Sequence, residues 1–328
     1  MVFKTRILKQ LTLLADDRKT KNKTFSHRAY LNAIQYIKDY EGEISSPTDL
    51  DNISGISKTG SIRKKIIELM KTGKISEVKH ISKENIGQDL LKIYGVGPSK
   101  VNELINKHKV SSIDDLKEKL EKDDTILNSK QKAGFKYYND LLERIPRSEM
   151  KKHEDFIKNL IKKLDKNNDL IYRVTGSYRR GDEDSGDVDV LCTTKDNNIQ
   201  LFNEIIENLV KEEYVQEILA KGTKKFMGIC KLPRHQTSRR LDMIYTQKEY
   251  YPFALLYFTG SGQFNVDMRN HALSLGYSLS EYGLKKEGKF VDNKGKLFET
   301  EEDIFEFLGI KYIKPEDRKG GILENYLV

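Results

Sequence analysis

The chain contains 328 residues, and 37% of them are hydrophobic, which is enough for buried cores and excludes a globally disordered chain. A chain of this length favours two or three domains rather than one. The formal net charge is +8, and charged residues make up 33% of the chain, a balance that favours a polyanionic partner such as nucleic acid.

The two cysteines, Cys192 and Cys230, both lie in apolar segments and are too few for a disulfide framework. We therefore expect two buried thiols in a protein of a reducing, intracellular compartment, and the sequence does not distinguish a nucleus from a viral replication site. No apolar run is long enough to span a bilayer, so we expect no membrane partner.

A glycine-containing hairpin is predicted at residues 53–62, Ile-Ser-Gly-Ile-Ser-Lys-Thr-Gly-Ser-Ile. An amphipathic helix is predicted over residues 62–70, with Arg63, Lys64 and Lys65 at its start. A basic helix is commonly only a solvated face. After a hairpin whose glycine allows close approach to a phosphate, the same helix also favours DNA binding.

A second hairpin is predicted at residues 91–101, Leu-Lys-Ile-Tyr-Gly-Val-Gly-Pro-Ser-Lys-Val. Pro98 suits the first turn of a helix, because the amide that proline lacks would have no partner there. Gly95 and Gly97 let backbone amides approach a DNA phosphate closely. An ordinary glycine turn is the alternative, but the complete pattern favours a helix-hairpin-helix motif.

Residues 176–191, Gly-Ser-Tyr-Arg-Arg-Gly-Asp-Glu-Asp-Ser-Gly-Asp-Val-Asp-Val-Leu, begin with a turn suited to phosphate. The preceding residues 171–174 are predicted to form a strand that ends at this turn. Backbone amides, hydroxyls and guanidinium groups are good donors to an anion. The turn offers such donors at Gly176, Ser177, Arg179 and Arg180.

Two carboxylates follow the turn, at Asp187 and Asp189. Because they are two residues apart, a strand would point both to one face and direct Val188 and Val190 into the core. Neighbouring carboxylates repel each other unless a cation lies between them, and Mg²⁺ prefers carboxylates together with phosphate oxygens. The segment therefore predicts a metal and a polyphosphate at one place. An isolated Asp-x-Asp at a solvated strand edge is the alternative.

A third carboxylate is predicted on a neighbouring strand at residues 239–245, where alternate apolar residues leave Arg240 and Asp242 on the other face. Residues 226–230 also predict a strand, and the short connection at 234–238 favours an antiparallel pair. That pair would return Asp242 towards the first two carboxylates. A surface aspartate paired with Arg240 is the alternative, and it would not exclude catalysis.

In this order, the motifs resemble those of the family X DNA polymerases of the polymerase beta type, over residues 25–312. Residues 144–147, 222–228 and 256–261 match as well, and the last of these contains an aromatic pair followed by Gly-Ser that is particular to the family. The resemblance implies an α+β fold, in which a nucleotidyltransferase palm sheet follows helical helix-hairpin-helix domains.

The resemblance also implies a two-metal site with Mg²⁺. Asp187 and Asp189 would bind both ions, while Asp242 would bind one ion and help to activate the primer 3′-hydroxyl, with Arg240 orienting it. The residues implied to bind the incoming nucleotide are Arg144, Gly176, Ser177, Arg180, Gly186, Tyr257, Phe258 and Asn265. Those implied to contact DNA are Phe25, Gly55, Gly95, Gly97 and Arg269. Those implied to hold Na⁺ or K⁺ through backbone carbonyls are Asp51, Ile53, Ile56, Leu91, Ile93 and Val96.

In the N-terminal region, the resemblance implies a 5′-deoxyribose-phosphate lyase whose Schiff-base lysine aligns with Lys65. Lys64 is a neighbouring substitute, and Tyr30 matches a supporting tyrosine. Ser26 and Ser61 stand where the family usually has phosphate-binding lysines, so the sequence leaves lyase activity open.

We therefore expect a monomeric enzyme that fills short gaps in gapped or nicked DNA during repair, using deoxynucleoside triphosphates. The alternatives are a template-independent terminal nucleotidyltransferase, which the short connection at 234–238 disfavours, and a non-catalytic DNA-end scaffold, which the three carboxylates disfavour. The expected domains are a DNA-binding and possible lyase domain (1–82), a duplex-binding subdomain (83–147), a catalytic palm (148–250) and a nucleotide-selecting subdomain (251–328).

Overall fold

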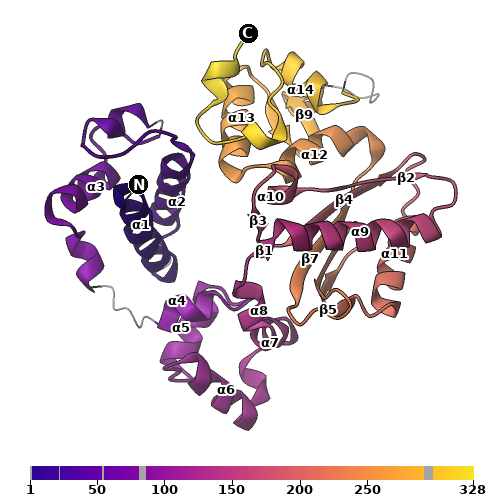
Figure 1. Cartoon of the computed structure of the whole chain (residues 1–328), viewed down its shortest axis with the longest axis horizontal. Helices are drawn as coiled ribbons and strands as arrows, with labels where there is room; N and C mark the ends of the chain where they lie inside the picture. Colours follow the sequence, from indigo (N-terminus) through magenta and orange to yellow (C-terminus); the bar gives the residue numbers. More distant parts are fainter. Residues whose placement is uncertain (1, 22, 54, 81–85, 292–297) are drawn as a thin grey trace. The chain divides into compact units, whose positions relative to one another are not determined.

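Figure 1 shows a computed structural model of the chain, which describes residues 2–21, 23–53, 55–80, 86–291 and 298–328. The chain divides into two compact units, Met1–Tyr138 and Asn139–Val328. The domain boundary predicted between residues 82 and 83 lies outside the described residues, and the division into four domains stays a prediction. No helix among the described residues is long and apolar enough to cross a membrane.

The described part of the first unit is helical. Its α-helices are α1 (Val2–Thr20), α2 (Thr24–Asp39), α3 (Ser61–Thr72), α4 (Ile86–Leu91), α5 (Pro98–Asn106), α6 (Ile113–Lys122) and α7 (Ser129–Lys136), with 3₁₀ turns η1 (Asp49–Asn52), η2 (Ser76–His80) and η3 (Asp124–Ile126). In α2, Tyr30, Ala33, Ile34 and Ile37 recur at the spacing of one helical face, and all four are buried. They join a core formed with α1 and α3, while α4, α5 and α6 enclose a second apolar core.

Both predicted hairpins lead into α-helices. The second is confirmed as predicted: α4 ends at Leu91, Gly97 is the N-cap of α5, and Pro98 is its first residue. The helix predicted over residues 62–70 is confirmed as α3, but the element before its hairpin is the 3₁₀ turn η1.

A five-stranded sheet forms the centre of the second unit, in the order β2-β4-β7-β6-β5. The strands are β2 (Leu170–Val174), β4 (Val188–Thr194), β5 (Val215–Lys221), β6 (Lys225–Cys230) and β7 (Arg239–Tyr245). β4 and β7 are parallel neighbours, and the other adjacent pairs are antiparallel. The predicted antiparallel pairing of residues 226–230 with 239–245 is thus confirmed, and so is the α+β class.

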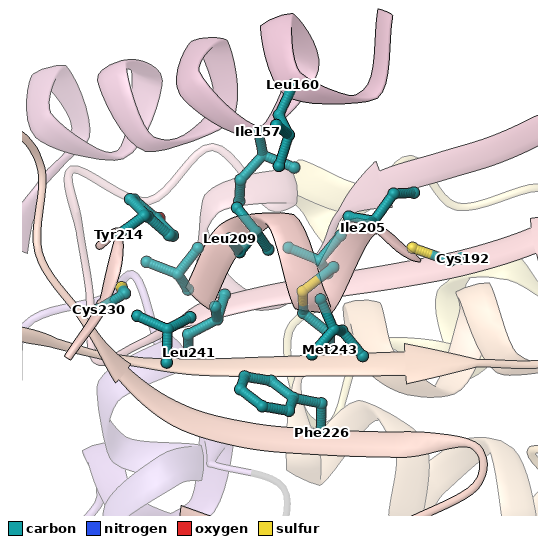
Figure 2. Close-up of a cluster of buried hydrophobic side chains, with 14 of the residues drawn as sticks. Ile157, Leu160, Cys192, Ile205, Leu209, Tyr214, Phe226, Cys230, Leu241 and Met243 are labelled. Atoms are coloured by element: carbon teal, nitrogen blue, oxygen red, sulfur yellow. The ribbon is translucent and has the colours of Figure 1, made fainter. Parts of the chain in front are cut away.

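Helices α9 (Arg147–Leu164) and α11 (Gln200–Lys211) contribute to the main core of this unit. Figure 2 shows Ile157 of α9 and Leu209 of α11 near Leu241 and Met243 of β7. The two cysteines are buried free thiols, as expected from the sequence. Because apolar residues of the central strands point into this core, their polar residues face the opposite side of the sheet.

The second unit has a further core, built around Phe264 and Phe305. The elements of this unit that have not yet been named are α8 (Tyr138–Leu142, which begins at the last residue of the first unit), β1 (Ile145–Pro146), α10 (Gly176–Arg179), β3 (Asp184–Ser185), η4 (Lys248–Tyr250), α12 (Tyr251–Thr259), α13 (Gly262–Ser274), β8 (Ser278–Ser280), β9 (Gly283–Lys286), β10 (Lys289–Phe290), α14 (Glu301–Phe307), η5 (Pro315–Asp317) and η6 (Leu323–Tyr326).

Candidate active site

The three carboxylates predicted from the sequence lie together at the sheet. Ligand oxygens of Asp187, Asp189 and Asp242 all lie within 4.8 Å of one another. The parallel register of β4 and β7 sets Asp189 directly beside Asp242. Asp187 lies one residue before β4 rather than within it. The parallel pairing of two strands therefore assembles the group.

Buried apolar residues fix the direction in which these carboxylates point. Val188 and Val190 of β4, and Leu241 and Met243 of β7, are all at most 2% exposed in the core. Because side chains alternate along a strand, Asp189 and Asp242 are directed to the opposite face. The predicted alternation of both segments is confirmed.

Arg240 bridges two members of the carboxylate group. Its guanidinium forms an ion pair with the Asp187 carboxylate through Nη2, and its Nη1 lies 3.1 Å from Oδ2 of Asp242. The pairing with Asp242 that the sequence left open is therefore present, together with a second pairing. Arg240 offsets part of the negative charge and orients both carboxylates.

The pKa of Asp189 shows that the group of three carboxylates favours a nearby positive charge. Burial, and then the neighbouring charge of Asp242, raise the pKa of Asp189 to about 6. A cation among the three carboxylates would relieve both effects, and a set of carboxylate oxygens is typical of hard divalent ions. The residues present therefore fit a divalent metal.

The predicted phosphate turn lies against Asp189. The strand β2 ends at Val174, and the turn that follows is the single helical turn α10. Gly176 has a φ of +60°, and a Cβ at this residue would lie 2.6 Å from Oδ2 of Asp189. The turn and the carboxylate can be this close because residue 176 has no side chain.

Two arginines predicted to bind the nucleotide are held near this turn. Arg180 donates from Nη1 to the carbonyl of Thr259 at 2.7 Å and from Nη2 to Asp182 at 2.9 Å. Arg144 donates to Asp184 at 2.8 Å, and a Cβ on Gly186 would lie 3.0 Å from its Nη1. Gly186 thus leaves room for the Arg144 guanidinium.

A buried charge network behind the turn was missed by the sequence analysis. Glu301 accepts hydrogen bonds from Arg179 at 2.6 Å and from Arg318 at 2.6 Å. Although burial opposes it, these hydrogen bonds hold the pKa of Glu301 below its ordinary value. Arg318 is only 1% exposed. The network connects α10 with α14 across 122 residues of sequence, a separation at which no local pattern gives a signal.

The residues predicted to line the sugar side of a nucleotide follow in α12 and α13. Tyr257 and Phe258 contact each other edge to face, with ring centroids 5.1 Å apart. Asn265 donates from Nδ2 to the carbonyl of Tyr257 at 2.7 Å. The Arg269 guanidinium lies 5.9 Å from the centroid of the Tyr257 ring. One cluster therefore holds these three residues together with Arg269, which was predicted to contact DNA.

The two hairpins of the first unit share a backbone geometry. Gly55 and Gly95 have φ angles of +84° and +83°. The amide three residues after the predicted carbonyl ligand closes a short turn: the Val96 amide donates to the carbonyl of Ile93 at 3.0 Å. The Ile56 amide donates to the carbonyl of Ile53 at 3.2 Å in the same way. The similarity supports equivalent roles, and the cation sites stay predictions, as do those at Asp51 and Leu91.

Glu77, which the sequence did not indicate, lies beside the lysine implied in a lyase site. Lys65 forms an ion pair with Glu77, and Arg18 pairs with the same carboxylate. Tyr30 is 3% exposed, and burial raises its pKa, while the charge of Lys65 has the largest opposing effect. Phe25, predicted to contact DNA, is 90% exposed.

Four domain families match the chain in the order expected from this architecture. They are a helix-hairpin-helix domain (residues 4–75), the fingers domain of DNA polymerase lambda (88–142), the DNA polymerase beta palm (144–248) and the DNA polymerase beta thumb (254–319). The palm match contains all three carboxylates. The chain belongs to the family X DNA polymerases of the beta type.

Its sequence is similar to those of several curated proteins. It is 29% identical to DNA polymerase lambda of Rattus norvegicus over 96% of this chain and 56% of the relative. It is 28% identical to DNA polymerase lambda of Arabidopsis thaliana, over 88% of this chain and 57% of the relative. It is also 28% identical to the DNA nucleotidylexotransferase of Xenopus laevis, over 88% of this chain and 63% of the relative. The chain thus spans less than two thirds of the length of these relatives.

Proposed function

We propose that this chain is a template-directed DNA polymerase that fills short gaps during repair. The observation that carries the proposal is the convergence of three carboxylates beside the glycine turn that was predicted to bind phosphate. Nucleotidyl transfer depends on alignment and on neutralising charge more than on covalent chemistry by the protein. A site that combines carboxylate oxygens with arginines and the first backbone amides of a helical turn suits that requirement.

Asp187 and Asp189 would hold two Mg²⁺ ions, and Asp242 would hold one of them. When bound, these ions neutralise charge on the triphosphate and make the primer 3′-hydroxyl a better nucleophile. The arginines near the carboxylates have separate roles. Arg180 and the amides of α10 bind triphosphate oxygens, and Arg240 keeps the Asp242 carboxylate oriented towards the 3′-hydroxyl.

The test is primer extension on a one-nucleotide gap, with each deoxynucleotide offered separately against each template base. We expect addition of the complementary nucleotide only. Asp242→Ala should abolish addition and leave the affinity for gapped DNA nearly unchanged. Asp155→Ala removes a half-exposed aspartate of α9 and is the matched control.

Residual synthesis by Asp242→Ala within about tenfold of the wild type, on the order of 1.4 kcal/mol in barrier, would contradict the assignment. Extension of a single strand without template would instead favour a terminal transferase. That alternative merits the test because the Xenopus laevis relative carries the name DNA nucleotidylexotransferase.

We also propose a 5′-deoxyribose-phosphate lyase in the first unit, with Lys65 as nucleophile. The supporting observation is the position of Lys65 beside the buried Tyr30 and close to Arg18. The neutral amine would add to the C1′ aldehyde, and water would leave to give an imine. Borohydride reduces that imine and traps the protein on DNA.

Trapping should be lost largely in Lys65→Ala and fully when Lys64, an exposed neighbour, is changed as well. Gap filling should survive both changes, because the carboxylates belong to the other compact unit. If the wild type fills gaps and is not trapped, the lyase proposal is wrong and this region only grips the DNA end.

A further inference from the structure

The Glu77 carboxylate lies between two cations of the first unit. Its Oε1 accepts from Nη2 of Arg18, and its Oε2 accepts from Nζ of Lys65. The hydrogen bond from Lys65 lowers the pKa of Glu77 against the opposing effect of burial. The carboxylate is therefore held in its charged form and is poorly suited to accept a proton.

Arg18 keeps its position without help from Glu77. Its Nη1 donates to Oδ2 of Asp17 at 2.7 Å, and the Asp17 side chain is only 5% exposed. Lys21 pairs with the other oxygen of Asp17 at 2.7 Å. Because Asp17 is fixed by burial and by two cations, Nη2 of Arg18 remains directed to one place when the Glu77 side chain turns away.

Arg18 and Lys65 therefore form an anion site, and the Glu77 carboxylate of the same chain occupies it. Of these three side chains, Glu77 is the most exposed, with 34% of the side chain accessible against 13% for Arg18 and 22% for Lys65. It belongs to the short 3₁₀ turn η2, so a rotation of its side chain breaks no long helix. A terminal phosphate carries nearly two negative charges and three acceptor oxygens, so it binds such cations more strongly than a carboxylate does.

We propose that Glu77 is a specificity-determining residue that blocks Lys65 until the 5′-phosphate of a gapped DNA displaces its carboxylate. The inference rests on the proposed action of this chain on DNA gaps. An ammonium held by a carboxylate cannot attack an aldehyde. Exchange of Glu77 for a phosphate on Arg18 releases Lys65, which then loses a proton to solvent before it reacts. DNA ends without a 5′-phosphate leave the block in place.

The test compares the affinity of the full chain for one-nucleotide gaps that carry a 5′-phosphate or a 5′-hydroxyl at the downstream end. The preference is the ratio of the affinity for the 5′-phosphate end to that for the 5′-hydroxyl end. Glu77→Gln should raise this ratio roughly fivefold, the size expected for one partly exposed charge. Glu43→Gln removes an exposed charge from the same unit and should leave the preference unchanged. Arg18→Gln should bring the preference close to one, both alone and combined with Glu77→Gln.

Glu77→Asp provides a second variant if Glu77→Gln folds poorly, because the shorter carboxylate cannot reach both cations and should raise the preference to a smaller extent. An unchanged or reduced preference in both variants overturns the proposal, and so does an equal increase in affinity for both DNA ends. Gap filling is measured in parallel. Its absence in the wild type would overturn the proposed polymerase function and leave the binding result interpretable, whereas normal gap filling with an unchanged preference would overturn the Glu77 block alone.

Discussion

Gly176 is the residue on which the geometry of the carboxylates and the phosphate turn jointly depends. A Cβ at this residue would lie 2.6 Å from Oδ2 of Asp189, and the φ of +60° is itself unfavourable for a side chain. We expect Gly176→Ala to displace Asp189 and to slow single-turnover extension about 100-fold, because small misplacements of catalytic groups have effects of that size.

The control for this prediction is Gly262→Ala, since a Cβ there would meet nothing within 4 Å. Its extension rate should stay near that of the wild type. A Gly176→Ala enzyme with an unaltered rate would show that the turn does not constrain Asp189.

His153 predicts a pH dependence of stability. Its Nδ1 lies 2.6 Å from the Tyr214 hydroxyl, and burial lowers its pKa to about 4 despite Glu149, while Arg239 and His235 lower it further. The unfolded chain binds the proton near pH 6.5, so this contribution to stability is complete above pH 6.5 and is lost as pH falls towards 4. The loss approaches about 3 kcal/mol.

The measurement is the urea midpoint at about pH 7 and about pH 5, a window in which His153→Leu should flatten the decline. His108→Gln, which alters a histidine of the first unit, should keep the wild-type decline. An identical decline in His153→Leu would contradict the prediction.

At the scale of elements, the close packing of α7 against the second hairpin has a measurable effect. A Cβ on Gly134 of α7 would collide with the backbone carbonyl of Tyr94 in the hairpin. The Gln131 side chain also donates to the carbonyl of Gly95 at 3.1 Å. We expect Gly134→Ala to lower stability by about 1–3 kcal/mol, as overpacking does, and to weaken DNA binding by displacing the hairpin.

Gly97→Ala separates packing from DNA contact, because a Cβ at residue 97 would meet nothing within 4 Å. It should leave the unfolding free energy nearly unchanged and still weaken binding to gapped DNA, since the methyl group keeps a phosphate from the backbone. Normal affinity in this variant would exclude Gly97 from the interface.

The sequence predicted those elements whose information is local. The period of two in residues 239–245 located Asp242, and Gly97-Pro98 located the start of α5. The parallel contact of β4 with β7 depends on strand order, which no short pattern specifies. Glu77 and Arg18 are 59 residues apart, and Arg179 and Glu301 are 122 apart, so these ion pairs appear only after folding.

At the scale of the whole molecule, the net charge of +8 predicts a strong effect of salt. If about six phosphates are contacted, the affinity for gapped DNA should fall roughly a thousandfold between about 50 mM and 200 mM salt. Phe25→Ala is the informative comparison, because an exposed ring stacks on bases without releasing counterions. It should lower affinity and leave the slope against salt unchanged. A slope near zero in the wild type would contradict binding through phosphates.

The buried network of Arg179, Glu301 and Arg318 has a consequence for exchanging parts between related polymerases. Glu301 and Arg318 lie in the predicted nucleotide-selecting region, whereas Arg179 is the last residue of α10, the predicted phosphate turn. A chimaera joined near residue 250 would transplant two members of the network without the third. Because a buried charge that loses its partner costs about 3–5 kcal/mol, such grafts should fold only when residue 179 is inherited from the same parent as residues 301 and 318.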